Sequence, residues 1–271
     1  MPADLHPFDA AIRLLPDGDD AFAGATSPGY ANMVGPYGGI VAAQLLNAAW
    51  THRARAGEAL ALTVNYAGPI ADGPFRITAR PVRTNRSTQH WWIELTQSGE
   101  PAATASAVFG ARRETWSSTE IAPPEVPPAT SLARSRVAGR PAWFGRYDFR
   151  VVRGDLPDFA QPREAEDSES CTWVRDDPPR PLDFPALAAL CDVFYPRIYR
   201  RRGKWVPAAT VTLTTYFHAD GGALARQGDR FVLGVARSLR FGAGYADQTA
   251  EIWGDDGTLL ATSFQLVYFK E

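Results

Sequence analysis

Sulfur and imidazole side chains are scarce in this chain of 271 residues, which contains two cysteines, two methionines and four histidines. Cys171 and Cys191 lack the CxxC spacing of a metal-binding or redox pair, so the sequence predicts neither a disulfide framework nor a metal site. No HExxH or HxxxH pattern provides a zinc site either. We therefore expect no metal, no cofactor and two reduced thiols, of which Cys191 is buried.

Long apolar runs, an excess of one charge and a GxSxG motif are also missing. No apolar run approaches the length that spans a bilayer, and the first residues lack the basic and apolar regions of a signal peptide. A formal charge of −2 gives no general attraction to nucleic acid, and without GxSxG a serine-hydrolase elbow is not indicated. The sequence therefore predicts no membrane span, no nucleic-acid partner and, by default, a cytoplasmic location.

What the chain does contain is one unit that occurs twice. The segment 75–109 has a counterpart at 231–267, and each has a long strand-like run, a second run, a glycine turn and a final alternating strand. An alanine-rich helical segment and an alternating segment precede each copy. A duplication of this kind is typical of a pseudo-dimer, in which one chain forms what two copies would otherwise assemble.

The first unit is predicted to contain one buried helix and several strands. Two short strands are expected at 11–15 and 21–25, followed by a loop rich in glycine and proline that ends at Gly38 and Gly39. The alanine-rich run 40–50 predicts a helix, which should be buried because it is apolar on most faces. Alternating apolar residues and turn signals then predict strands at 60–66, 75–84, 89–96 and 102–111.

A proline-rich segment separates the two units. Residues 121–128 are too rich in proline for a helix or an interior strand, so 113–142 is predicted to be an extended linker. The predicted domains are then an N-terminal unit at 1–112 and a C-terminal unit at 143–271.

The second unit repeats the pattern of the first. Asp183 is a suitable N-cap for a helix that runs to about Tyr195, where Pro196 discourages continuation. Strands are expected at 147–152, 171–174, 211–217, 231–240, 249–253 and 259–269. A sheet wrapped around an apolar helix buries the apolar faces of both elements. This α+β arrangement is the hot-dog architecture, and two tandem copies make a double hot-dog.

Four polar side chains of the second unit are candidate site residues. Asp192 lies in an apolar helical segment, where a carboxylate is costly to bury unless it has a partner or a function; a packing or capping role is the alternative. Gln265 lies on a strand with a core-like pattern, although a strand could equally direct it to solvent. Thr210 and Thr212 should share one face of their strand because side chains alternate, but threonine is common in strands for packing alone.

The chain resembles the acyl-CoA thioesterase II family over nearly its whole length. The resemblance rests on Gly38-Gly39 before the first helix, on Asp192, and on the strands 210–218 and 261–265. It implies an acyl-CoA substrate, hydrolysis of its thioester to free acid and coenzyme A, and a place in fatty acid metabolism. It also implies association of the chain into a homodimer.

The same resemblance implies roles for the candidate residues. Asp192 would be the general base that activates a water molecule, and Thr210 and Gln265 would orient that water toward the thioester carbonyl. Relatives often have aspartate at the position of Thr212, so the choice between the two threonines stays open. In the first unit the counterparts are approximately Gln44, Ala59, Ala61 and Ala107, which indicates that only the second unit keeps the chemistry.

Tyr37, Gly38 and Gly39 are the candidate substrate-binding residues. Backbone N–H groups at a helix N-terminus favour a developing oxyanion, and glycine allows close approach of a substrate. An ordinary loop and helix start explains these residues equally well. The basic run 197–204 could meet the phosphates of coenzyme A, although a solvated helix end is the preferred explanation.

Two other kinds of hot-dog protein are the alternatives to a thioesterase. A hot-dog enoyl-CoA hydratase or dehydratase typically relies on Asp and His in the helix region. The four histidines offer no such pairing: His6, His52, His90 and His218. A non-catalytic protein that binds acyl groups or acyl-CoA is the other alternative. Acyl chain length depends on pocket depth, which the sequence does not give.

Overall fold

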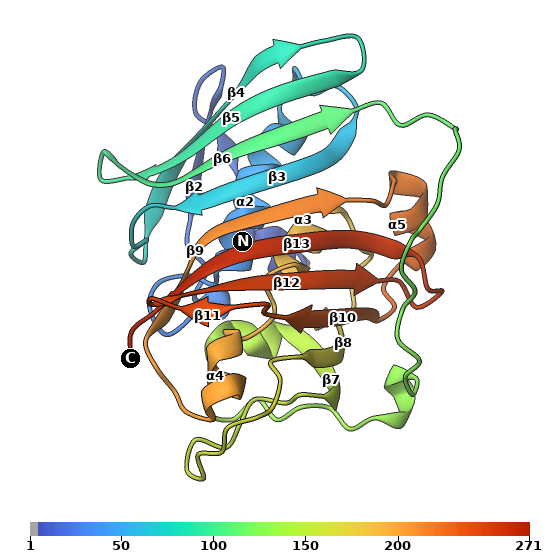
Figure 1. The fold of residues 1–271 in the computed structure, drawn as a ribbon. Coiled ribbons are helices and arrows are strands. Elements are labelled where there is room, and N and C mark those ends of the chain that lie inside the picture. The colour runs from blue at the N-terminus through green and yellow to red at the C-terminus, as the bar shows by residue number, and fades with distance from the viewer. Residues whose placement is uncertain (1–4) are drawn as a thin grey trace.

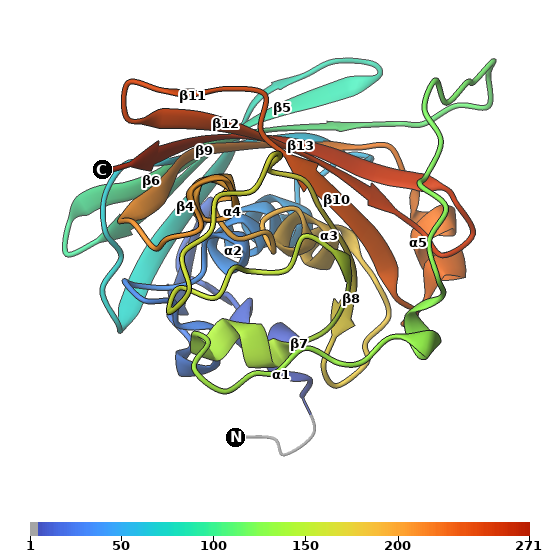
Figure 2. The same ribbon diagram turned by 60° about the horizontal axis from the view of Figure 1, so that its bottom comes forward.

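One curved antiparallel sheet forms an outer wall, and the two central helices lie on its concave side (Figures 1 and 2). The computed structural model describes residues 5–271. The short strand β11 (Phe241–Gly242) pairs with β12, outside the main path of the sheet. Along that path the strands are β1 (Leu15–Pro16), β2 (Ala21–Ala25), β4 (Pro74–Thr84), β5 (Thr88–Gln97), β6 (Glu100–Gly110), β3 (Glu58–Tyr66), β9 (Ala208–Phe217), β13 (Leu259–Phe269), β12 (Tyr245–Trp253), β10 (Val232–Arg237), β8 (Ser170–Asp176) and β7 (Tyr147–Arg153).

The two halves of the chain meet in the middle of this sheet, where β3 pairs antiparallel with β9. The order β2-β4-β5-β6-β3 in the first half is mirrored by β8-β10-β12-β13-β9 in the second. Helices α2 (Gly38–Thr51) and α3 (Phe184–Leu190) pack against each other inside the curve of the sheet. The α+β double hot-dog is therefore confirmed, with a single sheet shared by both halves.

The two central helices differ in length, with fourteen residues in α2 and seven in α3. The predicted helix 40–50 lies within α2, which is buried along most of its length because apolar residues occupy nearly all its faces. Asp183 caps α3 as predicted, since its carboxylate accepts a hydrogen bond from the Ala186 N–H at 2.8 Å. However, α3 ends at Leu190, well before the predicted end at Tyr195.

The early end of α3 has a cause on the neighbouring strand. The Cys191 carbonyl accepts hydrogen bonds from Ser263 Oγ at 3.2 Å and from Gln265 Nε2 at 3.5 Å. These side chains of β13 satisfy a carbonyl that a longer helix would have paired internally. Asp192 therefore lies in the turn that follows α3, and the prediction that it sits within a helix was wrong.

The N-terminal segment also differs from the prediction. Residues 11–15 were expected to form a strand, but α1 (Pro7–Ala11) is a short helix and only β1 is extended. Proline at the first helical position and the His6 side chain, which accepts a hydrogen bond from a backbone N–H, both favour that helix start. The other predicted strands are present. β10 is shorter than the predicted 231–240 because the backbone beyond it binds the Asp247 carboxylate.

The predicted linker lies against the outer face of the second half. Within 113–142, regular structure is limited to η2 (Ala129–Ser131) and the first residue of η3 (Ala142–Arg146). Trp173 of β8 donates from Nε1 to the Pro127 carbonyl at 2.9 Å. The linker thus covers the outward side chains of β8 and β10 with an apolar cluster. The exact unit boundaries at 112 and 143 stay a prediction.

Three further short helices complete the fold: η1 (Pro28–Tyr30), α4 (Arg197–Arg202) and α5 (Gly221–Gln227). α4 starts after Pro196, so residues 197–202 of the basic run form a helix of their own, and Lys204 follows it. None of the helices formed by residues 5–271 combines the length and the apolar character that crossing a lipid bilayer requires.

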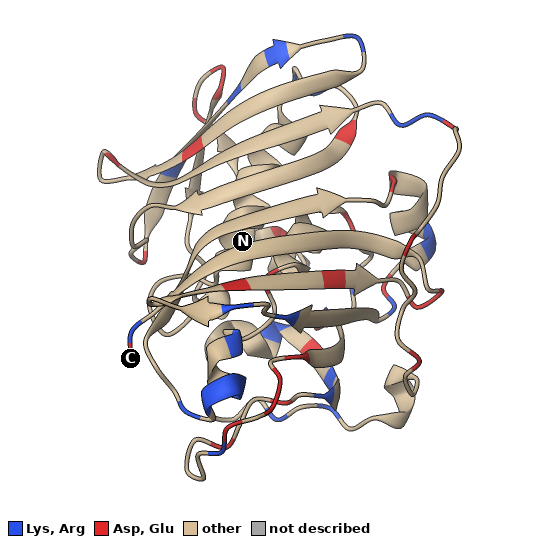
Figure 3. Ribbon diagram, in the orientation of Figure 1, with Lys and Arg blue, Asp and Glu red and all other residues tan. Residues whose placement is uncertain are grey.

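The middle of the sheet is free of charge on its outer face. β9 and β13 contain no acidic or basic residue, and Figure 3 shows both strands uncharged over their whole length. The outward side chains Tyr216, Phe264 and Leu266 are exposed. The rings of Tyr216 and Phe264 meet edge to face, with centroids 6.3 Å apart. An apolar face of this kind often marks a contact surface.

Candidate active site

A cavity of about 730 Å³ lies in the second half, between the inner face of the sheet and the N-terminus of α2. Side chains of β8, β9, β12 and β13 form one wall, and the loop before α2 forms part of the rim. Asp192, Thr210, Gln265 and Gly38 all line this cavity. Residues of both halves therefore contribute to it, as the sequence led us to expect.

Hydrogen bonds join the three side chains that were predicted to act together. Gln265 Nε2 donates to Asp192 Oδ1 at 2.9 Å, and Thr210 Oγ1 donates to Gln265 Oε1 at 3.2 Å. Asp192 comes from the turn after α3, Thr210 from β9 and Gln265 from β13. The Gln265 side chain is buried and directed inward, so its amide is fixed between the other two groups.

A β-bulge decides which of the two threonines faces the cavity. Thr210 pairs with Val267 of β13 and Thr212 pairs with Leu266, so Val211 is an extra residue in β9. Thr210 therefore shares the inner face with buried Val267, whereas Thr212 shares the outer face with exposed Leu266. The prediction that both threonines share one face was wrong because the bulge interrupts the alternation. Thr212 does not line the cavity.

Burial controls the protonation of Asp192. Desolvation raises the pKa of this carboxyl from 3.8 to about 7. Hydrogen bonds from the Gln265 side chain and the Gly39 backbone oppose that rise because they favour the charged form. The result is a carboxylate that exchanges a proton near neutral pH, which is the property that a general base requires.

Gly38 and Gly39 bring the start of α2 close to this carboxylate. A Cβ on Gly38 would lie 2.7 Å from Asp192 Oδ2, and one on Gly39 would lie 2.6 Å from the Ala189 carbonyl oxygen. Both distances are too short for a real side chain, so only glycine permits this approach. The N-terminus of α2 therefore points its backbone N–H groups and its positive dipole toward Asp192.

Two tyrosines hold the start of α2 in place. The Tyr37 hydroxyl donates to the Ala189 carbonyl at 2.5 Å, and the Tyr66 hydroxyl donates to the Gly38 carbonyl at 2.8 Å. The Tyr37 ring is buried and stacks on Trp143 with centroids 4.3 Å apart. Tyr37, predicted to bind substrate, thus lines the cavity with its ring while its hydroxyl ties the two halves together.

Neither cysteine provides a nucleophile for the site. Burial raises the thiol pKa of Cys191 to about 12 and that of Cys171 to about 11, so neither is a thiolate at neutral pH. Cys191 is buried as predicted, and Cys171 is buried as well. None of the four histidines lines the cavity: His6, His52, His90 and His218. Within residues 5–271, no three His, Cys, Asp or Glu side chains gather as metal ligands.

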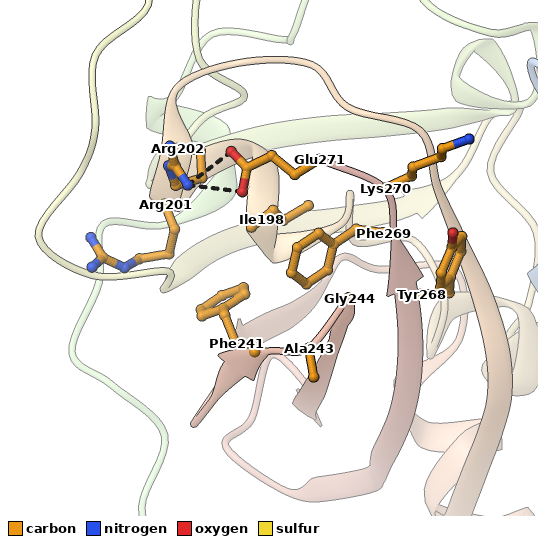
Figure 4. A pocket seen from close by; sticks show the side chains of 11 residues that line it. Ile198, Arg201, Arg202, Phe241, Ala243, Gly244, Tyr268, Phe269, Lys270 and Glu271 are labelled. Carbon is orange, nitrogen blue, oxygen red and sulfur yellow. Dashed lines mark hydrogen bonds and ion pairs between the residues drawn. The ribbon is translucent and has the colours of Figure 1, made fainter.

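The basic run 197–204 divides into one buried and several paired residues. Arg200 pairs with Asp167 at 3.2 Å, while Arg202 and Lys204 both pair with Glu271. Figure 4 shows the Arg202–Glu271 pair at the rim of a shallow recess near the end of β13. Arg200, Arg202 and Lys204 are thus neutralised by acidic neighbours, as at an ordinary solvated helix end, whereas Arg201 donates to the Ala165 carbonyl. Arg197 differs, because it is buried and lines the cavity.

Tyr66, Arg197 and Gln248 also line the cavity, although none of them was among the predicted site residues. Gln248 on β12 pairs directly with Gln265 on β13 and faces the cavity. Its signal was available, because it is a polar residue at an inward position of an alternating strand. Arg197 carried no such signal, since it begins a run of arginines that otherwise face solvent.

Comparisons with known proteins agree with this architecture. Models of the acyl-CoA thioesterase N-terminal and C-terminal domains match residues 27–110 and 120–269. A conserved protein of unknown function with a hot-dog fold from Alicyclobacillus acidocaldarius is 50% identical, with 99% of both chains covered and a TM-score of 0.94.

Two more distant structures carry thioesterase names. A putative thioesterase II from Thermobifida fusca is 21% identical, with 97% of both chains covered and a TM-score of 0.83. An acyl-CoA thioesterase II, TesB2, from Mycobacterium marinum is also 21% identical, with 97% of this chain and 98% of that chain covered and a TM-score of 0.75. At this level of identity the two structures support the fold alone. Among curated protein sequences, none matches this chain.

Proposed function

This chain belongs to the acyl-CoA thioesterase family, and we propose that it hydrolyses the thioester of an acyl-CoA with Asp192 as general base. The observation that carries the proposal is the hydrogen-bonded set of Asp192, Gln265 and Thr210 in the wall of a cavity. The site is built from both halves, so the whole chain is the catalytic unit.

In the first step, Asp192 accepts a proton from a water molecule as the water oxygen attacks the thioester carbonyl carbon. Gln265 fixes the orientation of the Asp192 carboxylate, and Thr210 fixes the orientation of the Gln265 amide. The carbonyl π bond opens and its electron pair moves to oxygen, which gives a tetrahedral oxyanion. Collapse of that intermediate breaks the carbon–sulfur bond, and the proton on Asp192 passes to the coenzyme A sulfur.

The oxyanion requires fixed donors, and the N-terminus of α2 supplies them in this proposal. The Gly39 N–H interacts with the Asp192 carboxylate and lowers its pKa. Gly38 is the first residue of α2, so its N–H has no partner within the helix and is the donor assigned to the substrate oxygen in this proposal. Glycine at this position also leaves space for the thioester beside the carboxylate.

The alternatives fit the site less well. A protein that only binds acyl groups gains nothing from a buried carboxylate in the wall of its cavity, and burial of that carboxylate is costly. A hydratase or dehydratase using an Asp–His pair has no histidine in the cavity wall. Thioester hydrolysis uses each of the three joined side chains.

The decisive experiment measures release of the coenzyme A thiol from a panel of acyl-CoAs. Wild-type protein should hydrolyse members of the panel, and Asp192→Asn should lower kcat/KM by about 10²–10⁴-fold. The rate of the wild type should rise with pH through about 7, because the base must be deprotonated. Unchanged turnover in Asp192→Asn would remove the assignment.

Asp176→Asn is the matched control for that substitution. Asp176 on β8 is another buried carboxyl whose pKa is raised to about 7 by desolvation, but it does not line the cavity. Both variants remove a buried acid and keep its shape. Only the loss at Asp192 should abolish hydrolysis.

We also propose that the chain forms a homodimer. The exposed, uncharged outer face of β9 and β13 supports this, with Tyr216, Phe264 and Leu266 as its apolar side chains. Light scattering should give twice the mass of the chain, and Phe264→Asp should shift it to the monomer. A monomer at all concentrations would refute the proposal.

A further inference from the structure

Arg197 is a buried cation without an anionic partner. Its side chain lines the cavity and is only 2% exposed. Nε and Nη2 of the guanidinium both donate to the Tyr195 carbonyl, and Nη1 donates to Ser170 Oγ at 2.5 Å and to the Ser168 carbonyl at 3.5 Å. No carboxylate within residues 5–271 forms an ion pair with it or stabilises its charge, and the nearby Arg200 opposes that charge. The hydrogen-bond partners of this arginine are therefore all neutral.

The positive charge is retained despite this environment. Burial lowers the pKa of Arg197 to about 10, so the guanidinium stays protonated at neutral pH. A buried charge without a counter-charge is expensive, and proteins normally pair it. The two other arginines in the cavity wall follow that rule, because Arg153 pairs with Glu169 at 2.7 Å and Arg140 pairs with Asp155 at 3.9 Å.

The wall around Arg197 is polar as well. Ser170 and Thr172 of β8 face the cavity, and so does Gln248 of β12. The Gln248 side chain is 2% exposed, and its Oε1 atom makes no hydrogen bond to the described chain. A pocket for a plain alkyl chain has no use for these groups, whereas an anionic ligand would give Arg197 the counter-charge that it lacks.

We propose that the acyl group of the substrate carries a carboxylate at its far end and that Arg197 binds this carboxylate. The proposal rests on the proposed thioesterase function and names its substrate class, the coenzyme A thioesters of dicarboxylic acids. Arginine suits this role because it stays charged when buried, and a charge-assisted hydrogen bond from a guanidinium N–H to a carboxylate is stronger than one to a neutral acceptor.

The position of Arg197 fits the far end of an acyl chain. Ser170, its hydrogen-bond partner, lies on β8, and β8 is separated from β13 by β10 and β12. Three strand spacings amount to about 14 Å along the sheet, and the curvature of the sheet shortens the path across the cavity. Asp192 and Gln265 act at one end of this space, and Arg197 closes the other. Chains of intermediate length therefore fit best.

The test compares acyl-CoAs in pairs that differ only in the terminal carboxylate: succinyl with butyryl, adipyl with hexanoyl, and suberyl with octanoyl. For wild-type protein, kcat/KM should favour the carboxylated member of the adipyl or suberyl pair by about tenfold or more, the value of one charge-assisted hydrogen-bonded contact. Arg197→Met should reverse that preference. Arg197→Lys should retain part of it, because it keeps the positive charge but has fewer N–H donors with which to hold its position.

Two results would overturn the proposal. An equal loss across all acyl-CoAs in Arg197→Met would mean that the arginine binds a phosphate of coenzyme A instead. An unchanged preference would mean that Arg197 only anchors the loop of Tyr195. If Arg197→Met does not fold, Ser170→Ala supplies the same test, with a smaller loss of preference expected because the guanidinium is less firmly held.

Binding of free acids separates this proposal from the thioesterase function. Suberate should raise the melting temperature of both wild type and Asp192→Asn more than octanoate does, because this readout needs no hydrolysis. Failure of wild-type protein to hydrolyse any acyl-CoA would refute the proposed function, and equal effects of the two acids would refute the carboxylate site.

Discussion

The two halves of the molecule have equivalent strands and an equivalent β-bulge, yet only the second half has polar side chains facing inward beside its bulge. A bulge follows Ala59 in β3 and another follows Thr210 in β9. At equal distance from the bulges, Ala107 of β6 pairs across to β3 and Gln265 of β13 pairs across to β9. The alanines of the first half thus stand where the second half has its threonine and glutamine.

This difference shows that the hot-dog architecture alone does not provide the chemistry. Both halves have the bulge, the central helix and the antiparallel strands, but the first half has Ala59 and Ala107 at the positions of Thr210 and Gln265. The first half instead contributes the N-terminus of α2, which needs no particular side chain beyond glycine. One copy therefore supplies backbone donors and the other supplies side chains.

Among exchanges of residues between the two halves, the largest loss of activity is expected when Gln265 of β13 is replaced by alanine, the residue that β6 has at the equivalent position. Gln265→Ala removes the group that holds both Asp192 and Thr210, and misplacement of a catalytic base should lower kcat/KM about 100-fold. The reciprocal Ala107→Gln should leave turnover unchanged but lower the free energy of unfolding by about 1–3 kcal/mol, because it buries an unpaired amide. Steady-state rates and chemical denaturation measure the two effects. A normal rate in Gln265→Ala would contradict the assignment.

A smaller effect should separate the two threonines. Thr210→Ala copies Ala59 and removes one hydrogen bond to Gln265, so kcat/KM should fall about tenfold. Thr212→Ala copies Ala61 on the outer face and should leave the rate unchanged. Kinetics of the two variants side by side provide the test. Equal losses in both would mean that the bulge does not decide which threonine acts.

The smallest effect concerns stability, because only the second half has a buried carboxyl beside its central helix. The pKa of Asp192 is higher in the folded chain than in the unfolded chain, so folding favours its protonated form and stability falls as pH rises from about 4 to about 7. At about pH 8, Asp192→Asn should therefore have a free energy of unfolding that exceeds that of wild type by at most about 4 kcal/mol. The variant should then unfold at a higher temperature than wild type.

That gain should disappear below about pH 4, where Asp192 is protonated in both the folded and the unfolded state. Thermal unfolding at several pH values measures the difference between the variant and wild type. A stabilisation that does not depend on pH would show that packing, rather than charge, is responsible.

The fold could be predicted well because it depends on repeated local patterns. The alanine-rich composition of α2 and the alternation in β4, β5 and β13 each point to one structure, and the order of elements then fixes the architecture. The end of α3 could not be predicted, since it depends on Ser263 and Gln265 of β13, which contacts this helix end in space but is far from it in the sequence.

The site was predictable in part for the same reason. Asp192 and Gln265 stand out as polar residues in apolar surroundings, and the structure joins them. The choice between Thr210 and Thr212 required the bulge at Val211, which no residue in the local sequence marks. Arg197 was assigned to a solvated run because its burial depends on the fold around it and not on its neighbours in the chain.

The short α3 has a consequence for how such a pocket can arise. α2 exceeds α3 by seven residues, which corresponds to about two helical turns or about 10 Å. Asp192, Val193 and Phe194 follow the early end of α3, and all three line the cavity. In the duplicated chain, one central helix thus keeps its full length, while the other ends early and places the residues that follow it in the cavity wall.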